Sequence, residues 1–115
     1  MKTNIWILNH YASDMYFDRG GRHYNFAKYL RRAGYAPVIF GANSKHGKPE
    51  RFLETDALWE ESIAEEINTP FVFVRARTYD GNGKQRVLNM IDFYCNVKKA
   101  AKEYAAQHGK PDVIF

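Results

Sequence analysis

Two adjacent glycines, Gly20 and Gly21, stand between a polar, aromatic loop and a run of residues with helical spacing that begins at Arg22. Glycine has no side chain, so a ligand can approach the backbone closely there. A helix N-terminus offers unpaired N–H groups and about half a positive charge, which favours an anion such as phosphate. The neighbouring arginines, Arg19 and Arg22, would add charge-assisted hydrogen bonds. The pattern predicts an anion site, although a turn required only by backbone geometry fits it as well.

The elements around this pair alternate between strand and helix. Residues 4–9 are short and almost wholly apolar, which is typical of a strand buried on both faces of a parallel sheet. Residues 22–33 have a helical apolar period, and Gly34 is a natural helix stop. The apolar stripe consists of Phe26, Ala27, Leu30 and Ala33. Residues 36–42 then predict a second strand, entered through Pro37, so the chain begins as a strand–helix–strand unit.

The middle of the chain leaves two interpretations open. Its apolar residues allow a short helix that begins near Asp56, whereas residues 61–67 could instead pair with the segment directly after them. These apolar residues are Leu58, Trp59, Ile63 and Ile67. Residues 71–79 are β-branched and aromatic and predict a strand, and residues 80–83 are strong turn formers.

A long helix of roughly six turns should follow this turn. Its apolar stripe consists of Val87, Met90, Ile91, Tyr94, Val97, Ala101, Tyr104 and Ala105. Arg86 and Asn89 share one helix face, where they could anchor the preceding turn or bind a substrate. Gly109 and Pro111 end the helix, and residues 111–115 predict another buried strand.

This order of elements predicts an α/β fold with an open, mostly parallel Rossmann-like sheet. We expect residues 1–115 to be a single, incomplete N-terminal domain, truncated at its fourth or fifth strand. In such sheets ligands bind beyond the carboxyl ends of the strands. The residues that we place on this cleft rim are Asn9, His10, Tyr11, Tyr79, Asp80 and Asn82.

The charge of the chain is unevenly distributed. Residues 1–48 hold eight basic and two acidic residues, whereas the remainder holds nine basic and eleven acidic residues, so the net charges are +6 and −2. This bias favours phosphate-bearing partners or an acidic membrane surface. The single cysteine, Cys95, suits a reducing compartment, and the apolar runs are too short to span a membrane. We therefore expect a cytoplasmic protein, with a peripheral contact at the inner face of the membrane as a further expectation.

Several function classes are disfavoured. A G-x-G-x-x-G fingerprint and a P-loop are both missing, so no dinucleotide cofactor is expected. The four histidines show no metal-ligand spacing with Cys95 or the carboxylates, which predicts no metal site. The aromatic residues fall mostly at positions that face the core, so nucleic acid is not an expected partner.

Three segments resemble one enzyme family. Residues 19–40, RGGRHYNFAKYLRRAGYAPVIF, resemble the opening of the family-4 glycosyltransferases, in which a Gly-Gly turn leads into a helix and a second strand. Residues 78–94, TYDGNGKQRVLNMIDFY, and residues 110–115, KPDVIF, are similar to a branch associated with bacterial surface-polysaccharide synthesis. The likeness covers almost the whole chain, and its motifs are specific in combination.

The resemblance implies a GT-B architecture, in which two Rossmann-like domains enclose the active site and this chain supplies the acceptor-side domain. The full-length enzyme would be a retaining glycosyltransferase that uses a nucleotide sugar and a saccharide or lipid-linked acceptor, with no metal or other cofactor. The amides of Gly20 and Gly21, with Arg22, would bind the donor diphosphate. The donor-binding domain and the histidine-bearing loop of the family would lie beyond Phe115, so we expect these 115 residues alone to be inactive.

Two other hypotheses remain open. The same loop could belong to a non-catalytic α/β module that binds a phosphate-bearing small molecule. The basic residues could instead serve mainly to dock the chain on a membrane or a nucleic acid.

Overall fold

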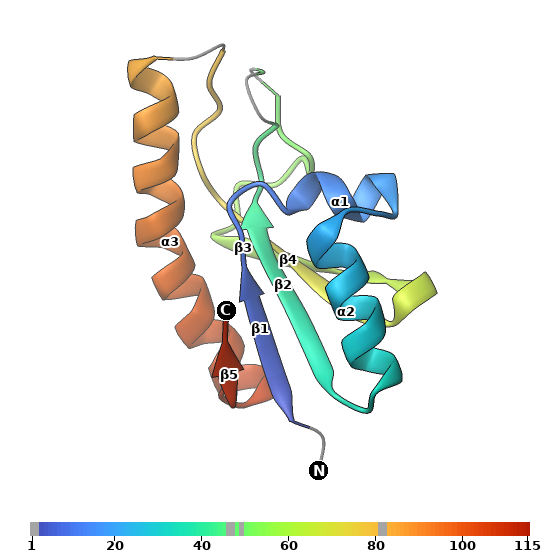
Figure 1. Cartoon of the computed structure of the whole chain (residues 1–115). Coiled ribbons are helices and arrows are strands. Elements are labelled where there is room, and N and C mark those ends of the chain that lie inside the picture. Colours follow the sequence, from blue (N-terminus) through green and yellow to red (C-terminus); the bar gives the residue numbers. More distant parts are fainter. Residues whose placement is uncertain (1–2, 46–47, 49, 81–82) are drawn as a thin grey trace.

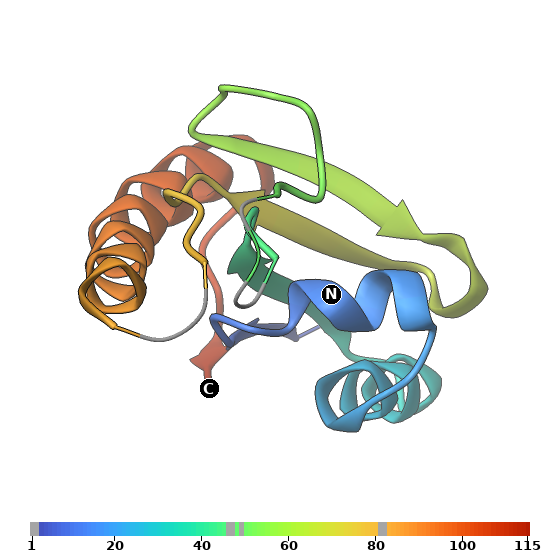
Figure 2. The same ribbon diagram turned by 90° about the horizontal axis from the view of Figure 1, so that it is seen from above.

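The computed structural model describes residues 3–45, 48, 50–80 and 83–115, and Asn82 of the predicted cleft rim therefore lies outside the described residues. The elements follow in the order β1 (Asn4–Leu8), α1 (Ser13–Asp18), α2 (Arg22–Arg32), β2 (Ala36–Ala42), β3 (Trp59–Ala64), the 3-10 turn η1 (Glu65–Ile67), β4 (Thr69–Val74), α3 (Lys84–His108) and β5 (Val113–Ile114). The helices α1 and α2 cover one face of the sheet and α3 covers the other (Figures 1 and 2).

The five strands form one mixed sheet in the order β3-β4-β2-β1-β5. Four of them are parallel, and only β3 runs antiparallel, against β4. The predicted α/β class with a mostly parallel sheet is confirmed. Because β1, β2 and β4 are parallel, their carboxyl ends meet at one edge of the sheet, uppermost in Figure 1, and the loops that lead to α2 and α3 begin there.

The sheet separates two apolar cores. Along β2 the side chains alternate, so that Val38 and Phe40 pack on the α3 side while Ile39 packs on the α1 and α2 side. Burial of each such side chain stabilises the fold by about 1.5–3 kcal/mol. A strand covered on both faces needs apolar residues at every position, which explains the uninterrupted run in β2.

The segment with two interpretations forms a strand. Trp59–Ala64 pairs antiparallel with β4, from Trp59 opposite Val74 to Ala64 opposite Thr69. The helix predicted from Asp56 is wrong, and the alternative, that residues 61–67 pair with the segment directly after them, is confirmed for the part that lies in β3. Here the hydrogen bonds and packing gained by pairing with β4 outweigh the weak helical spacing of the apolar residues in this segment.

Strand β4 ends at Val74, so the predicted strand over residues 71–79 begins and ends too late. Pairing with β2 stops where Ala42 lies opposite Val74. Beyond Val74 the backbone forms hydrogen bonds with side chains of α3. Asn96 Nδ2 donates to the carbonyl oxygen of Arg75 at 2.7 Å, and Asp92 accepts from the Arg77 N–H at 3.0 Å. These side-chain hydrogen bonds from α3 replace the backbone hydrogen bonds that a longer β4 would form in the sheet.

The predicted apolar stripes of the two long helices are partly wrong. In α2 the residues that face the core are Tyr24 and Ala27, whereas Phe26 and Ala33 are exposed. In α3 the buried residues are Asn89, Phe93, Val97, Ala100 and Tyr104. Four residues assigned to the core of α3 are exposed instead: Val87, Met90, Ile91 and Tyr94.

The last strand is also more open than predicted. In β5 both Val113 and Ile114 are exposed, and Phe115 is exposed as well, because β5 pairs only with β1 and lies at the sheet edge. No helix in the described part of the chain is long and apolar enough to cross a membrane.

Candidate functional site

The long loop after β1 contains a helix that the sequence did not reveal. Helix α1 packs on β2, where the Ser13 hydroxyl donates to the carbonyl oxygen of Ala42 at 2.6 Å. Gly41 makes this contact possible, because a Cβ there would lie 2.9 Å from the backbone nitrogen of Ser13. By fixing α1, this contact also fixes the start of the Gly-Gly turn that follows it.

The Gly-Gly turn opens directly into α2. Gly21 is the N-cap residue with φ of 104° and ψ of 170°, a conformation that is essentially restricted to glycine, and no side chain of the described residues caps the helix. A Cβ on Gly21 would also lie 2.9 Å from the Met15 side chain. Gly20 has no such demand, because its φ is not positive and a Cβ there would meet only the Asp18 carbonyl oxygen, at 3.9 Å. The fold thus explains one of the two glycines.

The end of β1 is tied to the first turn of α2. The Asn9 side-chain amide nitrogen lies 3.0 Å from His23 Nε2, and Asn9 Oδ1 accepts from the Tyr11 N–H at 2.9 Å. Burial, with a smaller effect of Arg22, lowers the pKa of His23, so the neutral ring can accept the Asn9 hydrogen bond. Asn9 is therefore a loop anchor in this structure, one of the two roles that its position allows.

The next residues link the β1 loop to α3. The His10 ring lies edge-on to the rings of Tyr11 and Phe93, with centroids 4.3 and 5.1 Å apart. Arg86 Nε donates to the Tyr11 hydroxyl oxygen at 3.4 Å. His10 and Tyr11 are half-buried, so the edge of the sheet is closed here by packed rings.

The predicted residues after β4 separate into two kinds. Tyr79 is fully buried and supports the loop, whereas Asp80 is exposed and accessible to a ligand. Asn89, also fully buried, donates through Nδ2 to Ser44 Oγ at 2.8 Å and to the carbonyl oxygen of Arg77 at 2.5 Å. Asn89 therefore anchors the segment directly after β4 and the loop after β2; that it anchors the turn of residues 80–83 or binds a substrate stays a prediction.

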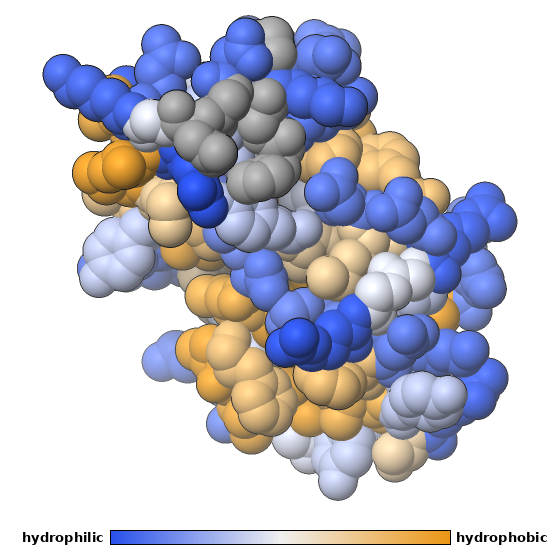
Figure 3. Space-filling view, turned by 45° about the horizontal axis from the view of Figure 1, so that its top comes forward, coloured by the Kyte–Doolittle hydropathy of each residue, from blue (hydrophilic) through white to orange (hydrophobic). Residues whose placement is uncertain are grey.

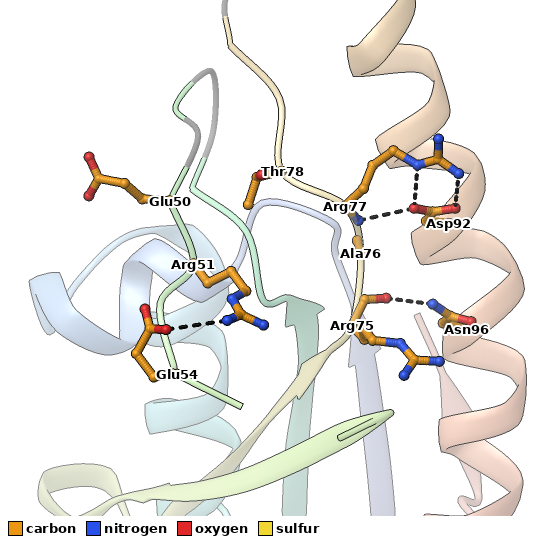
Figure 4. Close-up of a pocket in the computed structure, with 9 residues that line it drawn as sticks. All are labelled: Glu50, Arg51, Glu54, Arg75, Ala76, Arg77, Thr78, Asp92 and Asn96. Atoms are coloured by element: carbon orange, nitrogen blue, oxygen red, sulfur yellow. Dashed lines mark hydrogen bonds and ion pairs between the residues drawn. The ribbon is translucent and has the colours of Figure 1, made fainter. Parts of the chain in front are cut away.

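A polar pocket of about 960 Å³ lies beyond the carboxyl end of β4, between α3 and the segment before β3 (Figure 4). Its lining residues are Glu50, Arg51, Glu54, Arg75, Ala76, Arg77, Thr78, Asp92 and Asn96. Sequence reasoning missed this pocket because residues 75–78 were assigned to a strand. The signal that could have found it is the pair of arginines at alternate positions directly after a buried apolar strand.

Two of the three pocket arginines are held by carboxylates. Arg77 donates from Nε and Nη2 to Asp92 at 2.7 and 3.1 Å, and this pairing lowers the pKa of Asp92. Arg51 pairs with Glu54 at 3.3 Å and with Asp56 at 2.7 Å. Each charge is thereby compensated, and both guanidinium groups are fixed in orientation.

The third pocket arginine is engaged differently. Arg75 Nη1 donates to the Asp56 carbonyl oxygen at 3.0 Å, and the residue is exposed where it lines the pocket (Figure 4). A guanidinium group can donate two hydrogen bonds to a ligand oxygen pair.

A second, apolar groove of about 650 Å³ begins at the first turn of α2. It is lined by Ile7, Leu8, Arg22, His23, Phe26, Tyr29, Leu30 and Phe115. Arg22, which the sequence predicts to bind the donor diphosphate, is exposed where it lines this groove, in the first turn of α2. The Gly-Gly turn and this groove are therefore adjacent, whereas the arginine pocket lies at the end of β4.

No cluster of three or more metal-ligating side chains occurs among the residues that the structure describes. Comparisons of the chain with models of protein families, with curated proteins and with solved structures found no match.

Proposed function

We propose that this chain forms the acceptor-side, Rossmann-like half of a GT-B retaining glycosyltransferase that uses a nucleotide sugar. The observation that carries the proposal is the N-terminus of α2, which no described side chain caps, which follows two glycines and which lies beside the carboxyl end of β1. Donor diphosphate would accept hydrogen bonds from the amides at Gly20, Gly21 and Arg22. The acceptor, a saccharide or a lipid-linked saccharide, would lie along the carboxyl ends of the strands.

Gly20 supports this proposal more strongly than Gly21. The conformation of Gly21 and its contact with Met15 already require a glycine for the fold. Gly20 has space for a side chain and an ordinary φ, so its lack of a side chain has no structural cause among the described residues. Close approach of a ligand to the backbone is a physical reason for a glycine there that the contacts of Gly20 leave open.

The chemistry expected of this half is electrostatic. As the glycosidic bond of the donor breaks, negative charge grows on the departing nucleotide diphosphate, and preorganised N–H donors at a helix N-terminus stabilise that charge. Arg22, exposed beside these amides, would add a cation. Nucleotide recognition would come from the second domain that the proposal requires, so the described chain alone should not transfer sugar.

The test is donor turnover by the full-length gene product, with Gly20→Val compared with Ala33→Val. The control adds a branched side chain at an exposed position at the other end of α2. Loss of one or two charge-assisted hydrogen bonds should reduce kcat/KM for the nucleotide sugar about 10- to 100-fold in Gly20→Val alone. Wild-type turnover by Gly20→Val, or no sugar transfer by the full-length protein, would contradict the proposal.

A further inference from the structure

Helix α3 exposes an apolar stripe on the side that faces away from the sheet. Val87, Met90, Ile91 and Tyr94 have exposed fractions of 55, 46, 52 and 62%. Their spacing of i, i+3, i+4 and i+7 places them on neighbouring turns along one side of the helix. Other residues of α3, Phe93 and Val97 among them, pack on the sheet. This second stripe therefore has no partner among the described residues. Figure 3 shows hydrophobic residues at the surface along the left side, where α3 runs.

Lysines extend this stripe. Lys84 precedes it, and Lys98, Lys99 and Lys102 follow it over the next turns, all exposed. Lys98 Nζ lies 4.3 Å from the centroid of the Tyr94 ring, so the first of them already packs on the apolar part. We call these eight residues the α3 outer face: Lys84, Val87, Met90, Ile91, Tyr94, Lys98, Lys99 and Lys102.

The acidic residues of α3 contact residues of β3 and of the segment after β4. The helix has only two, and Asp92 pairs with Arg77 while Glu103 accepts from Trp59 Nε1 at 3.1 Å. Both partners belong to the β3 and β4 side of the molecule. The α3 outer face therefore carries lysines that form no salt bridge among the described residues.

We propose that the α3 outer face docks this protein on an anionic phospholipid bilayer. A helix with apolar residues on one side, flanked by lysines, lies in the plane of the interface with its apolar side chains in the acyl boundary. Lysine side chains reach back to the lipid headgroups, and each one near an anionic surface strengthens binding about fivefold. The proposal goes beyond the proposed enzymatic function and does not depend on it.

The charge of this face argues against a second copy of the chain as its occupant. A symmetric dimer through α3 would place the same surface on both sides and bring four lysines against four lysines. A bilayer that contains phosphatidylglycerol supplies the complementary charge and accepts the apolar side chains at once. Docking through α3 also leaves the Gly-Gly turn free, because α3 covers one face of the sheet while that turn joins α1 to α2 on the other face (Figure 1).

The basic bias of residues 1–48 had suggested a different location for a membrane contact. Helix α2 is itself basic and exposes Phe26 and Tyr29, but it covers the opposite face of the sheet (Figure 2). Both of these rings also line the apolar groove beside β5. The two helices therefore cannot lie on one flat surface together, and α2 provides a matched control.

The first experiment is sedimentation of the purified chain with vesicles of phosphatidylcholine that contain about 30% phosphatidylglycerol. Wild-type protein should bind these vesicles and bind pure phosphatidylcholine at least about tenfold more weakly. Lys98→Gln with Lys102→Gln should weaken binding about 25-fold, from the fivefold effect of each lysine. Ile91→Ser with Tyr94→Ser should abolish measurable binding, whereas the α2 control, Tyr29→Ser, should bind as wild type.

The second experiment uses Cys95, the single cysteine of the chain, which is exposed one turn after Ile91. A polarity-sensitive fluorophore attached there should shift to shorter wavelength on the anionic vesicles and remain unchanged with pure phosphatidylcholine. Circular dichroism of each variant establishes that loss of binding is not loss of fold. The proposal is overturned by any of three results: no binding to anionic vesicles, equal loss in the α2 control, or a fluorophore shift that follows protein concentration without vesicles.

Discussion

Alanine should destabilise the fold at Gly21 but not at Gly20, although the two glycines are adjacent. At Gly21, φ of 104° with ψ of 170° costs a residue with a side chain about 1–3 kcal/mol. Displacement of the Met15 side chain, 2.9 Å from the new Cβ, adds to that cost. The entropy that alanine removes from the unfolded chain offsets only about 0.4–1 kcal/mol. Gly21→Ala should therefore be net destabilising by about 1–2 kcal/mol.

At Gly20 only the entropic gain remains, because the new Cβ would be 3.9 Å from its nearest neighbour, the Asp18 carbonyl oxygen. Gly20→Ala should thus be neutral or stabilising by up to about 1 kcal/mol. For a chain of this length 1 kcal/mol corresponds to about 4 °C in Tm. Thermal unfolding should give a fall of about 4–8 °C for Gly21→Ala and no fall for Gly20→Ala. Equal destabilisation by both variants would refute the claim that only Gly21 is required by the fold.

Three further changes test the packing and the charges around the candidate site. Gly41→Ala should cost more than about 2 kcal/mol in urea unfolding, because the new Cβ would meet the backbone of Ser13, which cannot move as a side chain can. Tyr104→Phe should cost about 1–2 kcal/mol, because it removes the hydrogen bond that the Tyr104 hydroxyl donates to Glu61 at 2.6 Å. Because the pKa of His23 is lowered in the fold, its contribution to stability is present above pH 6.5 and lost on acidification, so His23→Gln should flatten the stability profile below pH 6.5.

The central strands and α2 were predictable because local and long-range signals agree there. Ala36–Ala42 was predicted with its observed bounds, since a short apolar run between Gly34 and a polar loop has few other interpretations. The strand β3 was ambiguous because its residues do not alternate clearly between apolar and polar. It forms a strand because it pairs with β4, a long-range contact that the local sequence does not contain. Helix α1 was missed because a six-residue helix inside a loop depends on the fit of Ser13 against Gly41.

The apolar pattern of α3 misled for a different reason. The helix carries two apolar stripes, one that includes Phe93 and Val97 and one that includes Ile91 and Tyr94, and a period of 3.6 residues fits either. The polar residue that decides between them is Asn89, which lies within the buried stripe. Its side chain is buried to bind the backbone of the loop after β4, a long-range requirement that periodicity does not contain.

The groups left open at the carboxyl ends of the strands indicate what kind of chemistry this chain can contribute. Two of the side chains predicted to line the cleft have structural roles instead. Asn9 forms hydrogen bonds with His23 and with the loop after β1, and Tyr79 is buried. What faces outward is the uncapped start of α2 with its N–H groups, and the guanidinium group of Arg75. These are donors with no proton to exchange near neutral pH, suited to holding and stabilising negative charge. Departure of a nucleotide diphosphate needs charge stabilisation of this kind more than a titrating acid, which is why an N–H-rich edge is consistent with the proposed role.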